Sequence, residues 1–122
     1  MIKIALVGHC GVDGPRIEAA ILNVCDTANV TSIHDPNALA RIVDDGADLL
    51  LFNRELGYGF GDEKGLEVMT ELRRANPQLK MMLISDRSDA QAAAKKVGAL
   101  PGFGKADLGT SRVENALRNA LA

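Results

Sequence analysis

The stretch Asp48-Leu49-Leu50-Leu51-Phe52-Asn53 decides the fold of this chain. Its run of large apolar residues, Leu49 to Phe52, stops abruptly at the polar Asn53, and a glycine-rich segment, Gly57 to Gly61, follows soon afterwards. A continuous apolar run between turn signals is typical of a strand that is buried on both faces of a parallel sheet. Asn53 would then lie at the carboxyl end of a central strand, where open α/β sheets bind ligands.

The length and composition fit one cytoplasmic globular domain. A chain of 122 residues has the usual size of a single domain, which we expect to span residues 1–122. Hydrophobic residues make up 47% and aromatic residues 3%, so the core must be aliphatic. The net charge of -2 argues against binding to nucleic acid or to anionic membranes. Neither a membrane-spanning run nor a signal peptide is recognisable, and Cys10 and Cys25 are too far apart for a disulfide framework.

Apolar runs alternate with amphipathic stretches along the whole chain. The predicted strands cover residues 2–7, 30–33, 48–53, 79–84 and 99–103, and the predicted helices cover residues 15–27, 36–46, 62–76, 89–97 and 107–121. Asp35 and Ser88 are the expected caps of the second and fourth helices. This alternation predicts a three-layer, doubly wound α/β sandwich with right-handed crossovers. Its loops would bring residues 8–13, Asn53, Ser85 and Lys105 close together.

The order of several short motifs resembles the receiver domain of bacterial two-component response regulators. The motifs are Asn53-Arg54-Glu55-Leu56, Gly65-Leu66-Glu67, Leu83-Ile84-Ser85, Gly98-Ala99 and Phe103-Gly104-Lys105. Each motif is weak alone, but together their spacing covers nearly the whole chain. The resemblance implies a (βα)5 sandwich with a five-stranded parallel sheet in the flavodoxin-like order 2-1-3-4-5.

In that family an aspartate accepts a phosphoryl group, an acidic pair binds Mg²⁺, and a Ser or Thr and a Lys contact the phosphoryl group. The resemblance places Asn53 at the phosphoacceptor position and Gly8 and His9 at the acidic pair. Ser85 and Lys105 match the remaining two residues. Gly102 falls where an aromatic switch residue is common, and residues 57–64 form a loop that is about four residues longer than usual.

These departures imply an atypical, or pseudo-, receiver. The amide of Asn53 has no anionic oxygen to attack phosphorus, and Gly8 and His9 lack the hard oxygen ligands that Mg²⁺ prefers. We therefore expect no enzyme activity, no cofactor and no metal. The resemblance implies a signalling module that binds a protein partner, through the face formed by residues 90–96, 99–103 and 112–118. We expect a monomer or a weak homodimer.

The side chains at the site leave several possibilities open. The amide of Asn53 could hydrogen-bond Lys105 or Ser85 and fix one signalling state, or the site could be a decayed remnant. Lys105 could pair with a carboxylate such as Asp13, bond backbone carbonyls or turn out to solvent, and we favour the last. His9, Cys10, Asp13 and His34 match no zinc-ligand spacing, and we expect His9 to be solvated.

A second function follows from the glycine-rich loop over residues 8–14. Its G-x-x-G-x-x-G pattern, after a strand and before a helix, resembles a phosphate-binding loop. Gly11, Asp13 and Gly14 would then contact the phosphate of a nucleotide or another small ligand. The chain is too short for a full dinucleotide-binding domain, so this ligand-sensor interpretation is the alternative.

Overall fold

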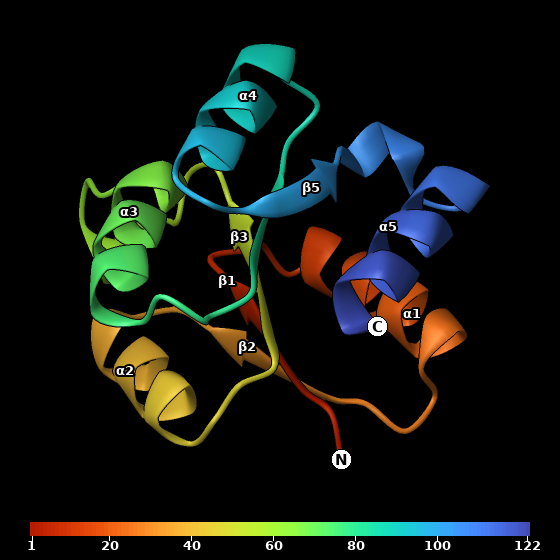
Figure 1. The fold of residues 1–122 in the computed structure, drawn as a ribbon, viewed down its shortest axis with the longest axis horizontal. Helices are drawn as coiled ribbons and strands as arrows, with labels where there is room; N and C mark the ends of the chain where they lie inside the picture. The colour runs from red at the N-terminus through yellow and green to blue at the C-terminus, as the bar shows by residue number, and fades with distance from the viewer.

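Five parallel strands form one sheet in the order β2-β1-β3-β4-β5 in this computed structural model, which describes residues 1–122 apart from the side chain of Tyr58 (Figure 1). The strands are β1 (Lys3–Val7), β2 (Asn29–Ile33), β3 (Leu49–Asn53), β4 (Met81–Ile84) and β5 (Leu100–Phe103). The predicted α/β class and the order 2-1-3-4-5 are confirmed.

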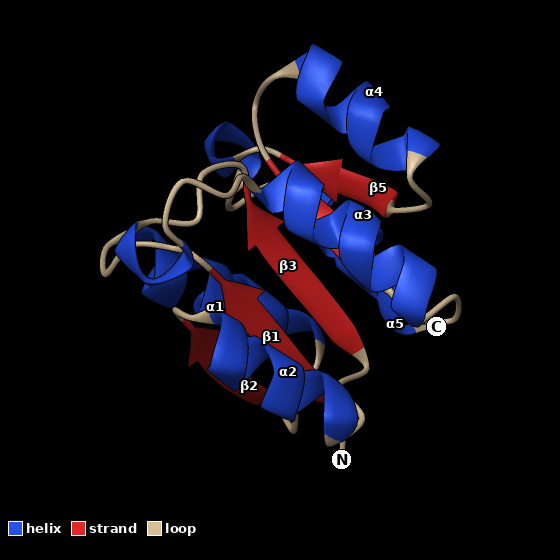
Figure 2. Cartoon of the chain, turned by 90° about the vertical axis from the view of Figure 1, so that its left-hand side faces the viewer, coloured by secondary structure: helices blue, strands red, loops and turns tan.

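Helices cover both faces of this sheet (Figures 1 and 2). They are α1 (Asp13–Val24), α2 (Pro36–Asp44), α3 (Gly65–Ala75), α4 (Ser88–Lys96) and α5 (Ser111–Leu121), with short 3-10 helices η1 (Tyr58–Phe60) and η2 (Lys105–Asp107). Helices α1 and α5 lie on one face, while α2, α3 and α4 lie on the other. None of the helices in the described part of the chain is long and apolar enough to cross a membrane.

The central strand β3 is buried on both faces, as its sequence predicts. Leu49 and Leu51 pack with α1 and α5, whereas Leu50 and Phe52 pack with the helices of the opposite face. All four side chains have no exposed surface. Because successive residues of a strand point to opposite faces, a strand with helices on both sides is apolar throughout.

The predicted starts of α3 and α5 are too early, and one of the two predicted caps is confirmed. Helix α5 begins at Ser111 rather than at residue 107, because the chain first forms η2. The carboxylate of Asp35 accepts a hydrogen bond from Ala38 N at 2.8 Å and caps α2 as expected. Helix α3 begins at Gly65, later than predicted, because the preceding segment forms η1 and an isolated bridge back to Glu55. Ser88 does not cap α4: it lies inside the helix, and the N-cap residue is Arg87.

The edge strand β5 contains an irregularity at Pro101. Met82 pairs with Leu100 and Ile84 pairs with Phe103, so β5 has an extra residue relative to β4. Proline lacks a backbone donor and is tolerated at edges and bulges.

Candidate functional site

Asn53 joins two loops at the carboxyl edge of the sheet. Its Nδ2 donates to the carbonyl oxygens of Gly8 at 3.2 Å and Glu55 at 2.9 Å, while its Oδ1 accepts from Arg54 N at 3.1 Å. The loop after β1 is thereby tied to the loop after β3. Of the two possibilities left open, a hydrogen bond from Asn53 to Lys105 or Ser85 is not formed, since the Asn53 amide bonds backbone groups instead.

Asn53, Ser85 and Lys105 nevertheless line one open hollow of about 320 Å³. Ser85 lies at the end of β4, where its Oγ accepts a hydrogen bond from Arg87 N at 3.2 Å. Parallel strands end at the same edge, which is why residues distant in sequence meet here. The structure therefore brings together Asn53, which ends β3, with Ser85 and Lys105, which follow β4 and β5.

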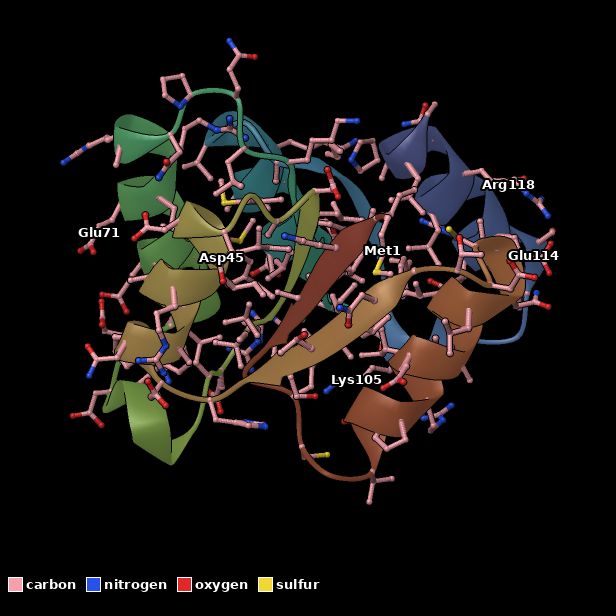
Figure 3. The ribbon with its side chains drawn as sticks, turned by 90° about the horizontal axis from the view of Figure 1, so that it is seen from below. Met1, Asp45, Glu71, Lys105, Glu114 and Arg118 are labelled. Atoms are coloured by element: carbon pink, nitrogen blue, oxygen red, sulfur yellow. The ribbon has the colours of Figure 1, made fainter. Side chains whose placement is uncertain are left out.

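Lys105 forms an ion pair with Asp13 at the start of α1. Its Nζ lies 2.9 Å from Asp13 Oδ2, and Figure 3 shows Lys105 beside α1. The hydrogen bond from Lys105, followed by one from the Cys10 thiol, lowers the pKa of the Asp13 carboxyl. The expectation that Lys105 turns out to solvent is wrong, because a carboxylate lies within its reach. The ammonium group is thus neutralised by the protein itself.

His9 is buried rather than solvated. Only 4% of the surface of His9 is exposed. Its Nε2 lies 2.9 Å from the carbonyl oxygen of Leu51, so this nitrogen must carry the hydrogen and donate it. Its Nδ1 is buried without a hydrogen-bond partner among the described residues. Burial lowers the pKa of His9, and the hydrogen bond to Leu51 opposes this shift. The imidazole therefore fills the interior as a neutral ring.

The backbone of Leu56 closes the space above Gly8. Gly8 has φ +76°, and a Cβ at this position would lie 2.6 Å from the Cα of Leu56. Leu56 and Phe60 are both buried in the core, so they anchor the loop that crosses here. Sequence reasoning missed these anchors, although the apolar Phe60 between Gly59 and Gly61 was a usable signal.

The residues at this edge do not fit the Mg²⁺ ion that the resemblance implies. Gly8 offers neither a side chain nor room for one, and His9 is turned into the interior. Asp13 is held by Lys105, and the Asn53 oxygen already accepts a backbone hydrogen bond. No three His, Cys, Asp or Glu side chains among those described are grouped so as to hold a metal ion.

A larger open hollow of about 630 Å³ lies between the loop after β1 and residues 55–64. Gly11 lines it, whereas Asp13 faces Lys105 and Gly14 is buried in α1. The first amides of α1 are already bonded, because Asp13 N donates to Cys10 Sγ and Gly14 N to Cys10 O. Pro15 has no amide hydrogen. This helix start therefore offers little to a phosphate group.

Gln91 covers the place where an aromatic residue at position 102 would stand. A Cβ at Gly102 would lie 2.0 Å from Leu83 O, so the backbone leaves no room for a side chain. Gln91 Nε2 donates to Leu83 O at 2.9 Å and to Ser85 O at 3.0 Å. The adjacent Phe103 is buried against α1 and α5. Gln91 Nε2 also lies 3.5 Å from Phe103 O, so the carboxamide fixes α4 to the ends of β4 and β5.

Similar solved structures agree on the fold. No family model and no curated protein sequence matches the chain. Among solved structures, the signal receiver domain of merR from Colwellia psychrerythraea 34H has a TM-score of 0.77 at 12% identity, over 99% of this chain and 98% of that one. The receiver domain of TorR, the response regulator of the TMAO respiratory system, has a TM-score of 0.77 at 22% identity, over 99% and 97%.

A further similar structure is the Salmonella typhimurium response regulator RcsB, with a TM-score of 0.71 and 17% identity. The match covers 99% of this chain and 57% of the RcsB chain, and that structure concerns the DNA interaction of RcsB. Structural similarity at such low sequence identity shows the architecture alone, and the activity has to be argued from the site. The chain has the flavodoxin-like fold of response regulator receiver domains.

Proposed function

We propose that this chain is a phosphorylation-independent signalling module, a pseudo-receiver that acts by binding a protein partner and is not an enzyme. The observation that carries the proposal is the bonding of Asn53, whose amide ties the loops after β1 and β3 together. In the family that the chain resembles, a phosphoryl group at this edge of the sheet is contacted by a Ser or Thr and by a Lys. Here the orienting contacts belong to the protein, so one arrangement is held without a modification.

Two other features support this proposal. The Lys105 ammonium, which would offset the charge of a phosphoryl group, is already paired with Asp13. The space that metal-binding carboxylates would need at Gly8 is taken by Leu56. We infer that Asn53, Gly8, His9, Ser85, Gly102 and Lys105 are equivalents of a phosphorylation site that no longer transfers phosphate.

Titration with Mg²⁺ and beryllium fluoride, followed by ¹⁵N NMR, tests this proposal directly. We expect no saturable shifts of the signals of Asn53, Ser85 or Lys105. The TorR receiver domain, titrated in the same way, is the comparison protein. Asn53→Asp should also fail to become labelled by acetyl phosphate, measured by intact mass. Saturable binding of both ions by the unchanged protein would refute the proposal.

The partner surface that we propose is the face of α4, β5 and α5. A hollow of about 450 Å³ there is lined by Gln91, Ala92 and Lys95 of α4, Gly102 of β5 and Arg112 of α5. Alanines along α4 allow a partner to approach its backbone closely. A photo-crosslinking residue at Ala92 should capture one defined partner in cells, while the same residue at the exposed Ala19 of α1 should not. Equal capture from both positions would contradict this assignment.

The ligand-sensor alternative rests on the hollow beside Gly11, whose volume is within the range of about 300–1,000 Å³ that is usual for small-molecule sites. The bonded amides of α1 argue against a phosphate ligand there. Thermal unfolding with a panel of nucleotides separates the two functions, because a ligand of the folded state raises the midpoint. We expect no rise.

A further inference from the structure

We propose that an apolar hollow between α2 and α3 is a docking site for a protein segment that carries one apolar side chain between basic residues. This surface is separate from the face of α4, β5 and α5, so the inference goes beyond the proposed function. The tests of the proposed function and of this docking site are therefore independent, and either proposal can fail without the other.

The hollow reaches down to the hydrophobic core. It has a volume of about 200 Å³ and is lined by Pro36, Leu39 and Ala40 around α2, Phe60 of η1, and Val68 and Leu72 of α3, together with two glutamates. Leu39, Phe60 and Val68 belong to the core cluster and are 5%, 4% and 7% exposed. They form an apolar floor, while the exposed Ala40 lies at the rim.

The volume of this hollow indicates what it can hold. Sites for small molecules usually have about 300–1,000 Å³, so this one is too small for a typical ligand. Protein interfaces, by contrast, depend on a few anchoring side chains that enter small desolvated pockets. A single Leu, Met or Phe side chain of a partner matches this size and this apolar floor.

The charges at the hollow specify the flanking residues of the partner. Glu63 and Glu71 are the charged residues of its described lining, and neither forms an ion pair with another described side chain. Figure 3 shows Glu71 on the outer side of α3, on the opposite flank from Arg118. Two unpaired carboxylates beside an apolar pocket favour Lys or Arg next to the anchor and disfavour acidic segments.

A defined peptide set tests the docking site by ¹⁵N NMR of the full chain. The probe is a helical peptide of about 15 residues with one leucine between lysines on the same face. One matched peptide has glutamate in place of lysine, and another has serine in place of leucine. We expect saturable shifts confined to α2, α3 and residues 57–64 with the first peptide only.

Two variants locate the binding. The double variant Glu63→Gln with Glu71→Gln should bind the peptide about fivefold more weakly. The matched double variant Glu18→Gln with Asp26→Asn, on the α1 side, should bind it with nearly unchanged affinity. Ala40→Trp at the exposed rim should block the hollow, and its dispersed NMR spectrum would show that the variant folds. No saturable binding, shifts centred on another face, or equal weakening by both double variants would overturn the proposal. Self-association that Ala40→Trp abolishes would also overturn it, since a second copy of the chain would then be the occupant.

Discussion

Leu56 passes over Gly8 with its Cα 2.6 Å from the point where a Cβ on residue 8 would lie. The end of β1 is therefore closed by the protein's own backbone. Because Asn53 also bonds Gly8 and Glu55, the loops after β1 and β3 are interlocked by packing and by hydrogen bonds. An acidic side chain at residue 8 would have to displace this entire crossing.

Replacing Gly8 with alanine should destabilise the protein strongly. The positive φ and the contact with Leu56 together predict a loss of about 2–4 kcal/mol in the free energy of unfolding. Urea unfolding measures it, with Gly11→Ala as the control, because nothing lies within 4 Å of a Cβ at Gly11. Equal losses in the two variants would show that Leu56 moves aside easily.

Replacing Lys105 with methionine should raise the pKa of Asp13 toward its ordinary value of 3.8. The hydrogen bond from Lys105 is the main cause of the lowered pKa, so its removal favours the protonated carboxyl. Carbonyl-detected NMR titration of Asp13 measures the change. Arg16→Met should have a smaller effect, because Arg16 Nη1 lies 3.8 Å from the carboxylate. An unchanged pKa in Lys105→Met would mean that the ion pair is absent in solution.

His9 should make the stability fall as the pH is lowered below about 6.5. Burial lowers the pKa of His9 in the folded state, with Lys105 and His34 adding to the effect and Asp13 opposing it. The unfolded chain therefore binds the proton first, and the free energy of unfolding falls until the folded-state pKa is reached. Urea unfolding between about pH 7.5 and about pH 5 measures this slope.

A matched pair of histidine variants assigns the slope to one residue. His9→Asn retains a donor for Leu51 O and should flatten the dependence in this range, whereas His34→Asn at an exposed position should retain it. A slope that survives His9→Asn and disappears in His34→Asn would refute the assignment.

The fold could be predicted from local patterns, because its buried strands and amphipathic helices are continuous in sequence. The run at β3 placed Asn53 at the sheet edge, and its matching neighbours Ser85 and Lys105 meet it there. The environment of His9 could not be predicted, since its burial depends on a carbonyl of β3. The ion pair of Lys105 with Asp13 could not be predicted either, since it depends on the rotamers of both side chains. The crossing of Leu56 over Gly8 arises from a loop whose path is fixed by tertiary packing.

Arg73 should contribute strongly to stability, although it has no part in the candidate site. Its guanidinium donates to Pro77 O, to Leu79 O at 2.7 Å and to Gly98 O at 2.9 Å, so it joins the loop after α3 to the turn after α4. Arg73→Met retains the apolar stem but leaves these carbonyls without their donors, and should cost about 2–4 kcal/mol. Urea unfolding measures the loss against Arg74→Met, which changes an exposed residue on the same helix and should have little effect. Equal midpoints for the two variants would mean that water replaces the guanidinium at no cost, and that the two loops are held by the surrounding apolar packing instead.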